Sequence, residues 1–283
     1  YTAPFKDAMT LTIDAIGEME TMTIWDNEKM IGRQQYPLSL GLLYSAITQR
    51  IGLKPNEEEY ITMGMAAYGK PMFTEYMKEY LLKRNNHKGI SENILSWAKP
   101  YDLAASVQKV YEDELERIVR KYCKKINLVL SGGCALNCVA NSNLKRNIWI
   151  MPNPGDSGSS LGCIPAVTKE RLNWKGPFLG YNIEGEYPVD SIIKELETNK
   201  MVGVANGKAE FGPRALGNRS LLADPRLDIK DTVNDIKQRQ KFRPFAPAIL
   251  EEHFDDYFDG RKNRYMQFVS KAKHDYKSVT HVD

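Results

Sequence analysis

The sequence has few cysteines and no long apolar run, and each shortage narrows the class of protein. Four cysteines occur among 283 residues without a C-x-x-C pair, which is typical of reduced thiols in the cytoplasm rather than of a disulfide framework. Cys134 and Cys138 are expected to be small apolar helix positions rather than a metal pair. The roughly 20 consecutive apolar residues that a membrane helix needs are missing, so we expect no membrane partner.

Excess charge of one sign and the common catalytic motifs are also missing. The chain holds 39 basic and 36 acidic residues, and this near balance gives no support for a nucleic-acid partner. The motif G-x-S-x-G does not occur, and the four histidines have no zinc-ligand or triad context. What the chain does contain, 42% hydrophobic residues with 15 Tyr and 9 Phe, is typical of a folded globular protein.

The first third of the chain predicts an antiparallel meander. Three short segments show strand-like alternation or β-branched enrichment, namely 9–13, 20–25 and 29–36. Ser39 is expected to cap a helix that runs to Arg50 and stops at Gly52. The charged, Tyr-rich stretch 54–100 shows no regular pattern.

From residue 104 onward, helices and strands are expected to alternate. Apolar residues recur at helical spacing in 104–124. Helices are also expected at 135–144 and at 156–171. Short apolar strands are expected at 126–130 and 148–151. A meander followed by βαβ units predicts an α/β fold with a mixed sheet.

A composition break at 173–180 separates two predicted domains, 1–175 and 176–283. In the second domain we expect strands at 201–205, 221–223 and 246–250, and a helix at 229–237. The chain enters an apolar run soon after Tyr1 and stops at Asp283 as a strand begins. We therefore expect a fragment that is cut at both ends.

Three loops bring glycine and aspartate to the ends of predicted elements, namely 14–18, 131–133 and 154–158. Loops at the carboxyl ends of strands share one crevice in α/β folds, where glycines let the backbone approach a ligand and a helix N-terminus suits phosphate. Asp14 and Asp156 are hard oxygen ligands of the kind that divalent cations prefer. Such loops are also ordinary structural devices, so a ligand crevice and a purely structural role are about equally favoured.

The densest cluster of charge lies at 206–226, where arginines stand among glycine and proline. A guanidinium presents paired donors that match phosphate or carboxylate. Five basic residues are predicted to line one anion pocket: Lys208, Arg214, Arg219, Arg226 and Arg243. The alternative is a solvated basic surface, but the stiff residues between the arginines favour a pocket. The block lacks the interleaved aromatics that stack nucleic-acid bases.

Four blocks stand out together: MGMAAYGK at 63–70, LVLSGGCALN at 128–137, GKAEFGPRALGNRSLLADPR at 207–226 and KFRPFAP at 241–247. They resemble the O-carbamoyltransferases of nodulation-factor and antibiotic biosynthesis. The resemblance implies that 1–175 is the second half of an actin/sugar-kinase-like (RNase H-like) domain, similar to that of the tRNA threonylcarbamoyl transferases, with a metal and nucleotide site. It implies that 176–283 is an incomplete carbamoyl-phosphate/ATP-binding domain, similar to the threonylcarbamoyl-AMP synthases.

Proteins of that kind make carbamoyl-adenylate from carbamoyl phosphate and ATP, and pass the carbamoyl group to a hydroxyl of a sugar or natural-product acceptor. The resemblance implies catalytic roles for Lys208, Arg214, Arg219 and Arg226. It implies contacts with carbamoyl phosphate or the adenylate for Asn218, Ser220 and Arg243. It implies nucleotide contacts for Ser131, Gly132, Gly133, Asn137 and Gly155.

Asp14 and Asp156 match the metal-ligating aspartates of these proteins, which implies Fe²⁺, with Mg²⁺ accompanying ATP. Their H-x-x-x-H motif does not occur in this segment, so we expect half of a metal site. If the two aspartates share one cation, their carboxylates should converge within about 6 Å. Ala15 stands where glycine is usual, and it would be strained if its φ were positive.

Two other functions stay open at this point. One is a tRNA threonylcarbamoyl transferase relative, against which the arginine block and the second domain argue. The other is a non-catalytic module that binds a nucleotide or another anion. A homodimer is compatible with the sequence, and the sequence does not identify the acceptor.

Overall fold

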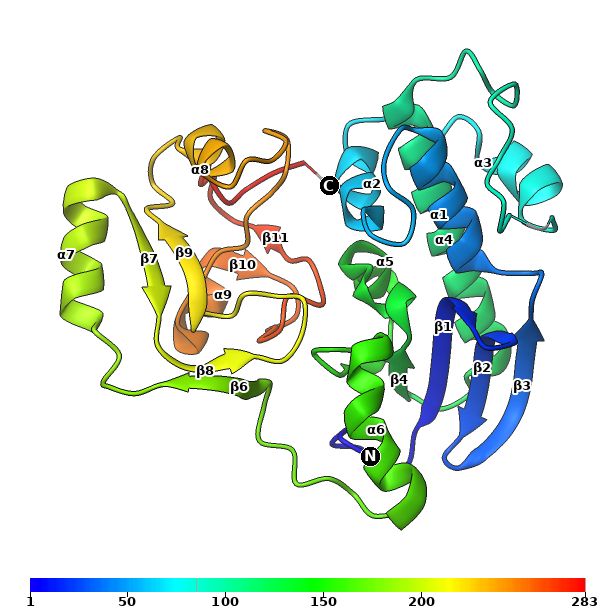
Figure 1. Cartoon of the computed structure of the whole chain (residues 1–283), viewed down its shortest axis with the longest axis horizontal. Helices are drawn as coiled ribbons and strands as arrows, with labels where there is room; N and C mark the ends of the chain where they lie inside the picture. The colour runs from blue at the N-terminus through cyan, green and yellow to red at the C-terminus, as the bar shows by residue number, and fades with distance from the viewer. Residues whose placement is uncertain (85, 283) are drawn as a thin grey trace. The chain divides into compact units, whose positions relative to one another are not determined.

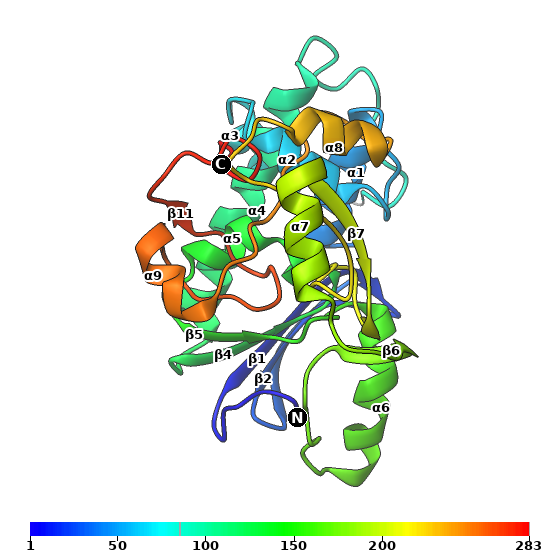
Figure 2. The same cartoon turned by 90° about the vertical axis from the view of Figure 1, so that its left-hand side faces the viewer.

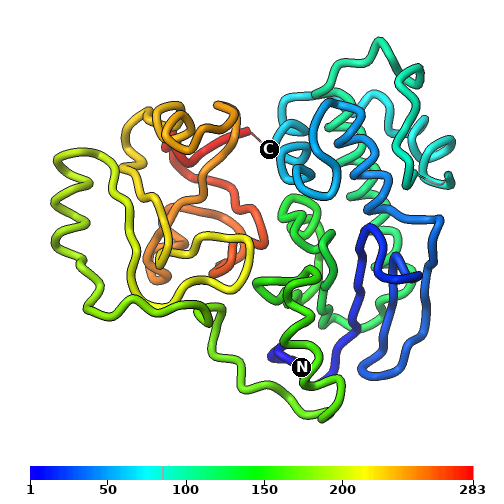
Figure 3. Tube along the Cα trace, in the orientation of Figure 1, coloured from blue at the N-terminus to red at the C-terminus, as the bar shows by residue number. Residues whose placement is uncertain are grey.

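The computed structural model describes residues 1–84 and 86–282. The chain divides into two compact units, 1–172 and 173–282, and each is described by itself. Figure 1 labels the helices and strands, and Figure 3 follows the trace from the N-terminus to the C-terminus.

The first unit is built on a five-stranded sheet of order β3-β2-β1-β4-β5. Its strands are β1 (Met9–Gly17), β2 (Glu20–Asp26), β3 (Lys29–Gln35), β4 (Asn127–Ser131) and β5 (Asn147–Ile150). β1, β2 and β3 form an antiparallel meander, whereas β1, β4 and β5 run parallel. The predicted α/β class and mixed sheet are therefore confirmed.

The helix α1 (Leu40–Arg50) packs against β1 and against α4 (Pro100–Tyr122), as Figures 1 and 2 show. It begins where the sequence predicted, because the Ser39 hydroxyl accepts the N–H of Leu42 at 3.0 Å. The same hydroxyl donates to the Ala15 carbonyl at 2.6 Å. A Cβ at Gly41 would lie 2.7 Å from the Ala15 nitrogen, so glycine is required for this close approach of α1 to β1.

The other helices of the first unit are short: α2 (Glu59–Ala66), α3 (Thr74–Tyr76), a π-helical turn Met77–Leu81, α5 (Cys138–Asn143) and α6 (Ser159–Thr168). The 3₁₀ turns Gly133–Leu136 and Asp156–Gly158 precede α5 and α6. The single helix expected at 135–144 is thus two pieces, because Asn137 has a non-helical ψ of 88°. The stretch 54–100, which showed no pattern, holds α2, α3 and the π-helical turn.

The second unit contains three two-stranded antiparallel sheets, β6–β8, β7–β9 and β10–β11. Its strands are β6 (Phe178–Ile183), β7 (Met201–Ala205), β8 (Gly207–Glu210), β9 (Arg219–Ala223), β10 (Phe258–Asp259) and β11 (Lys271–Ala272). Its helices are α7 (Val189–Asn199), α8 (Lys230–Ile236) and α9 (Phe254–Tyr257). The strand expected at 201–205 and the helix expected at 229–237 are confirmed, and β9 extends the strand expected at 221–223.

The strand predicted at 246–250 is wrong. Residues 244–250 have no regular secondary structure, and Leu250 is 65% exposed. Pro244 and Pro247 carry no backbone N–H and therefore cannot donate to a sheet ladder. The apolar residues 246–250 indicated a strand, but Pro247 lies inside it and Pro244 just before it, and neither can donate to a ladder.

The described helices include none with the length and apolar character needed to cross a membrane. α4, with 23 residues, is long enough, but it carries charged residues along one face.

Candidate functional site

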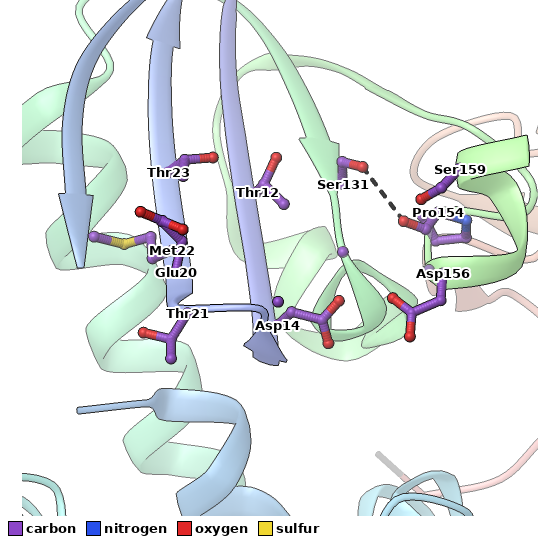
Figure 4. A pocket seen from close by; sticks show the side chains of 13 residues that line it. Thr12, Asp14, Glu20, Thr21, Met22, Thr23, Ser131, Pro154, Asp156 and Ser159 are labelled. Carbon is purple, nitrogen blue, oxygen red and sulfur yellow. Dashed lines mark hydrogen bonds between the residues drawn. The ribbon is translucent and has the colours of Figure 1, made fainter. Parts of the chain in front are cut away.

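A pocket of about 220 Å³ opens at the carboxyl ends of β1 and β4. Figure 4 shows the side chains that line it. Its lining residues are Thr12, Asp14, Gly17, Glu20, Thr21, Met22, Thr23, Ser131, Gly132, Pro154, Gly155, Asp156 and Ser159. The three predicted segments thus meet in one place, as expected for parallel strands. Residues 14–17, predicted as part of a loop, instead belong to β1, whose pairing with β2 is irregular between Ile13 and Gly17.

The parallel pairing of β1 with β4 creates this arrangement. Thr12 pairs with Ser131, so Asp14, two residues further along β1, lies beside the loop that follows β4. Gly132 has a φ of +88°, and a Cβ there would lie 2.1 Å from the Ile13 carbonyl oxygen. Its N–H donates to the Pro154 carbonyl at 2.8 Å. Only glycine fits at position 132, where the loop after β4 lies against β1 and contacts the loop 154–158.

The Asp14 carboxylate is held by one backbone donor from β1 and one from the segment after β4. Its Oδ1 accepts the N–H of Ala15 at 2.8 Å, and its Oδ2 accepts the N–H of Gly133 at 3.1 Å. Figure 4 shows this carboxylate and that of Asp156 facing each other across the pocket. Ala15 is outside the set of residues with positive φ, so the strain considered for this position does not arise.

The donor set suits a divalent cation in part. Each Asp14 oxygen keeps a lone pair beyond its one hydrogen bond, and Asp156 adds a second hard carboxylate. In the described part of the chain, no group of three His, Cys, Asp or Glu side chains is arranged to hold a metal. Asp14 and Asp156 therefore supply two carboxylates of the kind that a divalent cation prefers.

The residues predicted to contact the nucleotide fall into two groups. Ser131, Gly132 and Gly155 line the pocket, and Gly133 borders it through the bond from its N–H to Asp14. Asn137 is outside the lining. Its Oδ1 accepts the N–H of Ala140 at 3.0 Å and so caps α5.

Gln108, which the sequence analysis did not identify, connects α4 to the loop after β4. Its side chain is buried, with 5% exposure. Its Oε1 accepts from the Tyr44 hydroxyl at 2.9 Å and from Asn137 Nδ2 at 2.8 Å. Its Nε2 donates to Asn137 Oδ1 at 3.1 Å and to Glu112 Oε1 at 2.8 Å. A polar residue inside an otherwise apolar helical stripe was the signal in the sequence.

Burial beneath the same loop suppresses ionisation of neighbouring groups. The Tyr111 hydroxyl donates to the Cys134 carbonyl at 2.9 Å. Burial raises the pKa of Tyr111 and of Tyr44 well above the ordinary value of 10. It also raises the pKa of the Cys134 thiol, so this cysteine stays protonated and supplies no thiolate nucleophile.

In the second unit, the block 206–226 is organised around Glu210. Its Oε1 accepts three backbone N–H groups, from Leu216 at 2.7 Å, Asn218 at 3.0 Å and Arg219 at 3.3 Å. Burial acts to raise the pKa of Glu210, but these donors outweigh it and the pKa is lowered. The sequence analysis assigned Glu210 no role, and nothing in its local spacing indicated one.

The Arg219 guanidinium is engaged by backbone carbonyls. Nη1 donates to Asn206 at 2.9 Å and Asn218 at 2.7 Å, and Nη2 donates to Tyr181 at 2.9 Å and Gly207 at 3.1 Å. These acceptors lie in β6, in β8 and in the residues that border β8 and β9. Arg219 thus ties the strands of the second unit together through donors that the sequence analysis reserved for an anion.

Arg226 forms a bidentate ion pair with Asp224. Its Nε donates to Oδ1 at 2.9 Å and its Nη2 to Oδ2 at 2.7 Å. The Asp224 side chain is buried, whereas that of Arg226 is 70% exposed. The hydrogen bonds from Arg226 lower the pKa of Asp224 from 3.8 to about 2.

The remaining predicted residues of the second unit are spread along the chain. Asn218 Nδ2 donates to the Lys208 carbonyl at 2.8 Å, and Ser220 Oγ accepts the N–H of Gly217 at 2.9 Å. Both residues therefore lie at the turn that Glu210 holds. The Lys208 side chain is exposed and that of Arg214 is half-buried. The backbone carbonyl of Arg243 accepts from Asn234 Nδ2 of α8 at 3.1 Å.

Comparison of the sequence with models of known protein families identifies the family of this chain. The family model described as Carbamoyltransferase N-terminus matches residues 1–100 and 83–164, and the model described as Carbamoyltransferase C-terminus matches residues 193–283. The chain belongs to the carbamoyltransferase family. This confirms the resemblance that the four sequence blocks indicated.

Similar proteins of this family occur in several bacteria. Nodulation protein NolO of Bradyrhizobium diazoefficiens is 32% identical over 99% of this chain and 63% of its own length. Nodulation protein U of Azorhizobium caulinodans is 37% identical over 60% of this chain and 34% of its own length. The protein sll1178 of Synechocystis is 32% identical over 96% of this chain and 57% of its own length. The chain therefore spans less than two thirds of each of these relatives.

One of the four carbamoyltransferase-like blocks, 63–70, has a direct packing explanation. A Cβ at Gly69 would lie 1.9 Å from the Tyr101 carbonyl oxygen. The N–H of Lys70 donates to Asp102 Oδ1 at 2.8 Å, in the first turn of α4. Glycine at 69 therefore lets the segment after α2 dock against the start of α4.

Proposed function

We propose that this chain is part of an ATP-dependent O-carbamoyltransferase, which forms carbamoyl-adenylate in its C-terminal part and transfers the carbamoyl group to a hydroxyl acceptor. Membership of the carbamoyltransferase family supports carbamoyl transfer. The observation that carries the proposal is the pocket of the first unit, where Asp14 and Asp156 face each other beside two glycine loops.

In the first proposed step, carbamoyl phosphate and water give carbamate and phosphate. An oxygen of carbamate then attacks the α-phosphorus of ATP, which forms carbamoyl-adenylate and releases pyrophosphate. Both substrates are anionic, so positive side chains are needed to reduce repulsion and stabilise the charge that builds on the phosphate oxygens. We assign these contacts to Lys208, Arg214 and Arg243, with Asn218 and Ser220 as hydrogen-bonding groups.

Arg219 and Arg226 contribute to the same step in other ways. Arg219 donates to neutral carbonyls, so its full positive charge remains in the field of the site. The charge of Arg226 is balanced by Asp224. We therefore assign two roles to Arg219, which holds the strands together and adds positive potential at the site. Arg226 contributes the least positive potential.

In the second proposed step, the acceptor hydroxyl attacks the carbonyl carbon of carbamoyl-adenylate, and AMP leaves. Ser131, Gly132, Gly133 and Gly155 would hold the nucleotide, and the hydroxyl proton would pass to water. Asp14 and Asp156 would hold a divalent cation, Fe²⁺ by the resemblance, which when bound polarises the carbonyl oxygen. Hydroxyls of Thr12 and Thr23 in the lining suit a sugar-type acceptor, because hydroxyls both donate and accept hydrogen bonds.

The test is incubation of the full-length protein with carbamoyl phosphate, ATP and Mg²⁺, with phosphate and pyrophosphate measured separately. Release of both, dependent on both substrates, is the expected result. Nucleotide binding without pyrophosphate release would instead identify a non-catalytic binding module. Transfer of a threonylcarbamoyl group from added threonylcarbamoyl-AMP to tRNA, without consumption of carbamoyl phosphate, would contradict the proposal in favour of the threonylcarbamoyl transferase alternative.

A further inference from the structure

Three backbone N–H groups of one turn in the second unit converge on a single carboxylate oxygen. Those of Leu216, Asn218 and Arg219 donate to Oε1 of Glu210 at 2.7, 3.0 and 3.3 Å. That of Gly217 donates to Ser220 Oγ at 2.9 Å. Converging amides of this kind form a concavity that binds anions. In this protein the anion is a carboxylate of the chain itself.

We infer that Glu210 is a positioning residue, an internal anion that shapes the turn 216–219 and so fixes the loop that presents Arg214 and Asn218. The inference rests on the proposed function for its catalytic consequence. Its structural basis does not depend on that function.

The ends of this loop are fixed by the strands. Glu210 is the last residue of β8 and pairs with Phe178 of β6, and Arg219 is the first residue of β9 and pairs with Ala205 of β7. The bonds from 216, 218 and 219 to Glu210 therefore close the loop 211–218 at its base. Arg214 lies within the closed loop, so its place depends on that closure.

Contacts on the other side of the turn fix it in one orientation. Asn218 Nδ2 donates to the Lys208 carbonyl at 2.8 Å, and Arg219 Nη2 donates to the Gly207 carbonyl at 3.1 Å. Both acceptors are in β8, the strand that carries Glu210. β8 thus holds the turn through one side chain and two backbone carbonyls. Only the Glu210 carboxylate satisfies three amide donors at once, so its loss affects the turn most.

The experiment compares Glu210→Ala with Glu210→Gln in the full-length protein. The Gln amide oxygen can still accept the three N–H groups, whereas Ala leaves them without an acceptor. We expect Glu210→Ala to reduce pyrophosphate release by tens of fold through a raised KM for carbamoyl phosphate, since several bonds to a charged group are lost. Glu210→Gln should retain most of the activity. Glu184→Ala, which replaces an exposed acid of the same unit, is the matched control and should behave as wild type.

Acetate provides a rescue that a general loss of stability would not show. Added at about 50 mM, it should occupy the amide concavity of Glu210→Ala and restore activity several-fold, since carboxylates bind such backbone nests. Chloride at the same ionic strength should not. Absence of acetate rescue, or a Glu210→Gln variant as defective as Glu210→Ala, would overturn the positioning role.

Hydrogen exchange tests the geometry without any assay of activity. The amides of 216, 218 and 219 should exchange at least tenfold faster in Glu210→Ala than in wild type, and acetate should slow them again. Exchange within β7 should be unchanged. If the three amides exchange alike in both proteins, the inference is wrong even where the carbamoyltransferase assay succeeds. If that assay fails while the exchange pattern holds, only the proposed function is contradicted.

Discussion

At the scale of single residues, two arginines with the same guanidinium are used differently. Arg219 donates to four neutral carbonyls, whereas Arg226 pairs with the carboxylate of Asp224. The charge of Arg219 is therefore not cancelled by these partners, whereas that of Arg226 is balanced by Asp224. Sequence reasoning treated both as equal members of one anion pocket, because composition records the charge of a residue but not the partner that the fold supplies.

The Asp224–Arg226 pair predicts an acid-dependent loss of stability. The pKa of Asp224 is lowered to about 2, so its contribution is complete above its unfolded value near 4 and is lost as the pH falls from there toward 2. In chemical denaturation followed against pH, wild type should therefore exceed Asp224→Asn by a constant margin above about pH 5. That margin should shrink below pH 4.

The control for this prediction is Asp228→Asn, at an exposed position of the same segment. It should leave the free energy of unfolding within about 0.5 kcal/mol of wild type over the same pH range. A margin between wild type and Asp224→Asn that stays constant down to pH 2 would contradict the assigned pairing.

At the scale of elements, Gly132 in the loop after β4 lines the pocket. Gly132→Ala combines a positive φ with a Cβ 2.1 Å from the Ile13 carbonyl oxygen. We expect a loss of at least about 2 kcal/mol in the free energy of unfolding, measured by urea denaturation. Gly162→Ala is the matched control, because a Cβ there meets nothing within 4 Å. Within α6 it should stabilise by about 0.5–1 kcal/mol, and equal effects of the two changes would refute the steric explanation.

The Gln108 amide links α4 to Tyr44 of α1 and to Asn137 before α5. Its removal should therefore lower the free energy of unfolding through the loss of both contacts. In Gln108→Leu, the Tyr44 hydroxyl and the Asn137 amide lose a buried partner, with an expected cost of about 2–4 kcal/mol. Tyr44→Phe should cost about 1 kcal/mol. The double variant should cost clearly less than the sum of the two, since both changes break the same bond. Strict additivity in thermal or urea unfolding would show that the two side chains do not interact.

At the scale of the whole molecule, the proposed chemistry is divided between the two ends of the chain, and variants should separate its steps. Asp14→Asn removes a charge from the pocket of the first unit and should reduce carbamoyl transfer at least tenfold while leaving pyrophosphate release near wild type. Arg214→Ala should reduce pyrophosphate release itself. Phosphate, pyrophosphate and carbamoylated product are measured in parallel. Loss of pyrophosphate release in Asp14→Asn would contradict this division.

The sequence predicted the first unit better than the second for a physical reason. The meander and βαβ units carry strong local patterns, and Ser39 marks the start of α1 as a capping residue should. Strand order then brings Asp14, Ser131 and Asp156 to one pocket. In the second unit, β6 pairs with β8 across the intervening α7 and β7, and the role of Glu210 arises from that pairing and the turn. Such long-range contacts leave no periodicity in the local sequence.

The position of β3 at one end of the sheet order carries a consequence for the protein in solution. Its backbone has β2 on one side, and its apolar Met30 and Ile31 are 40% and 49% exposed. A strand of this kind is a template on which further chains can add, which leads to aggregation. Lys29 precedes the two apolar residues, and repulsion between this cation in neighbouring molecules opposes that growth, whereas the charge of Arg33 is balanced by Glu20 at 3.5 Å.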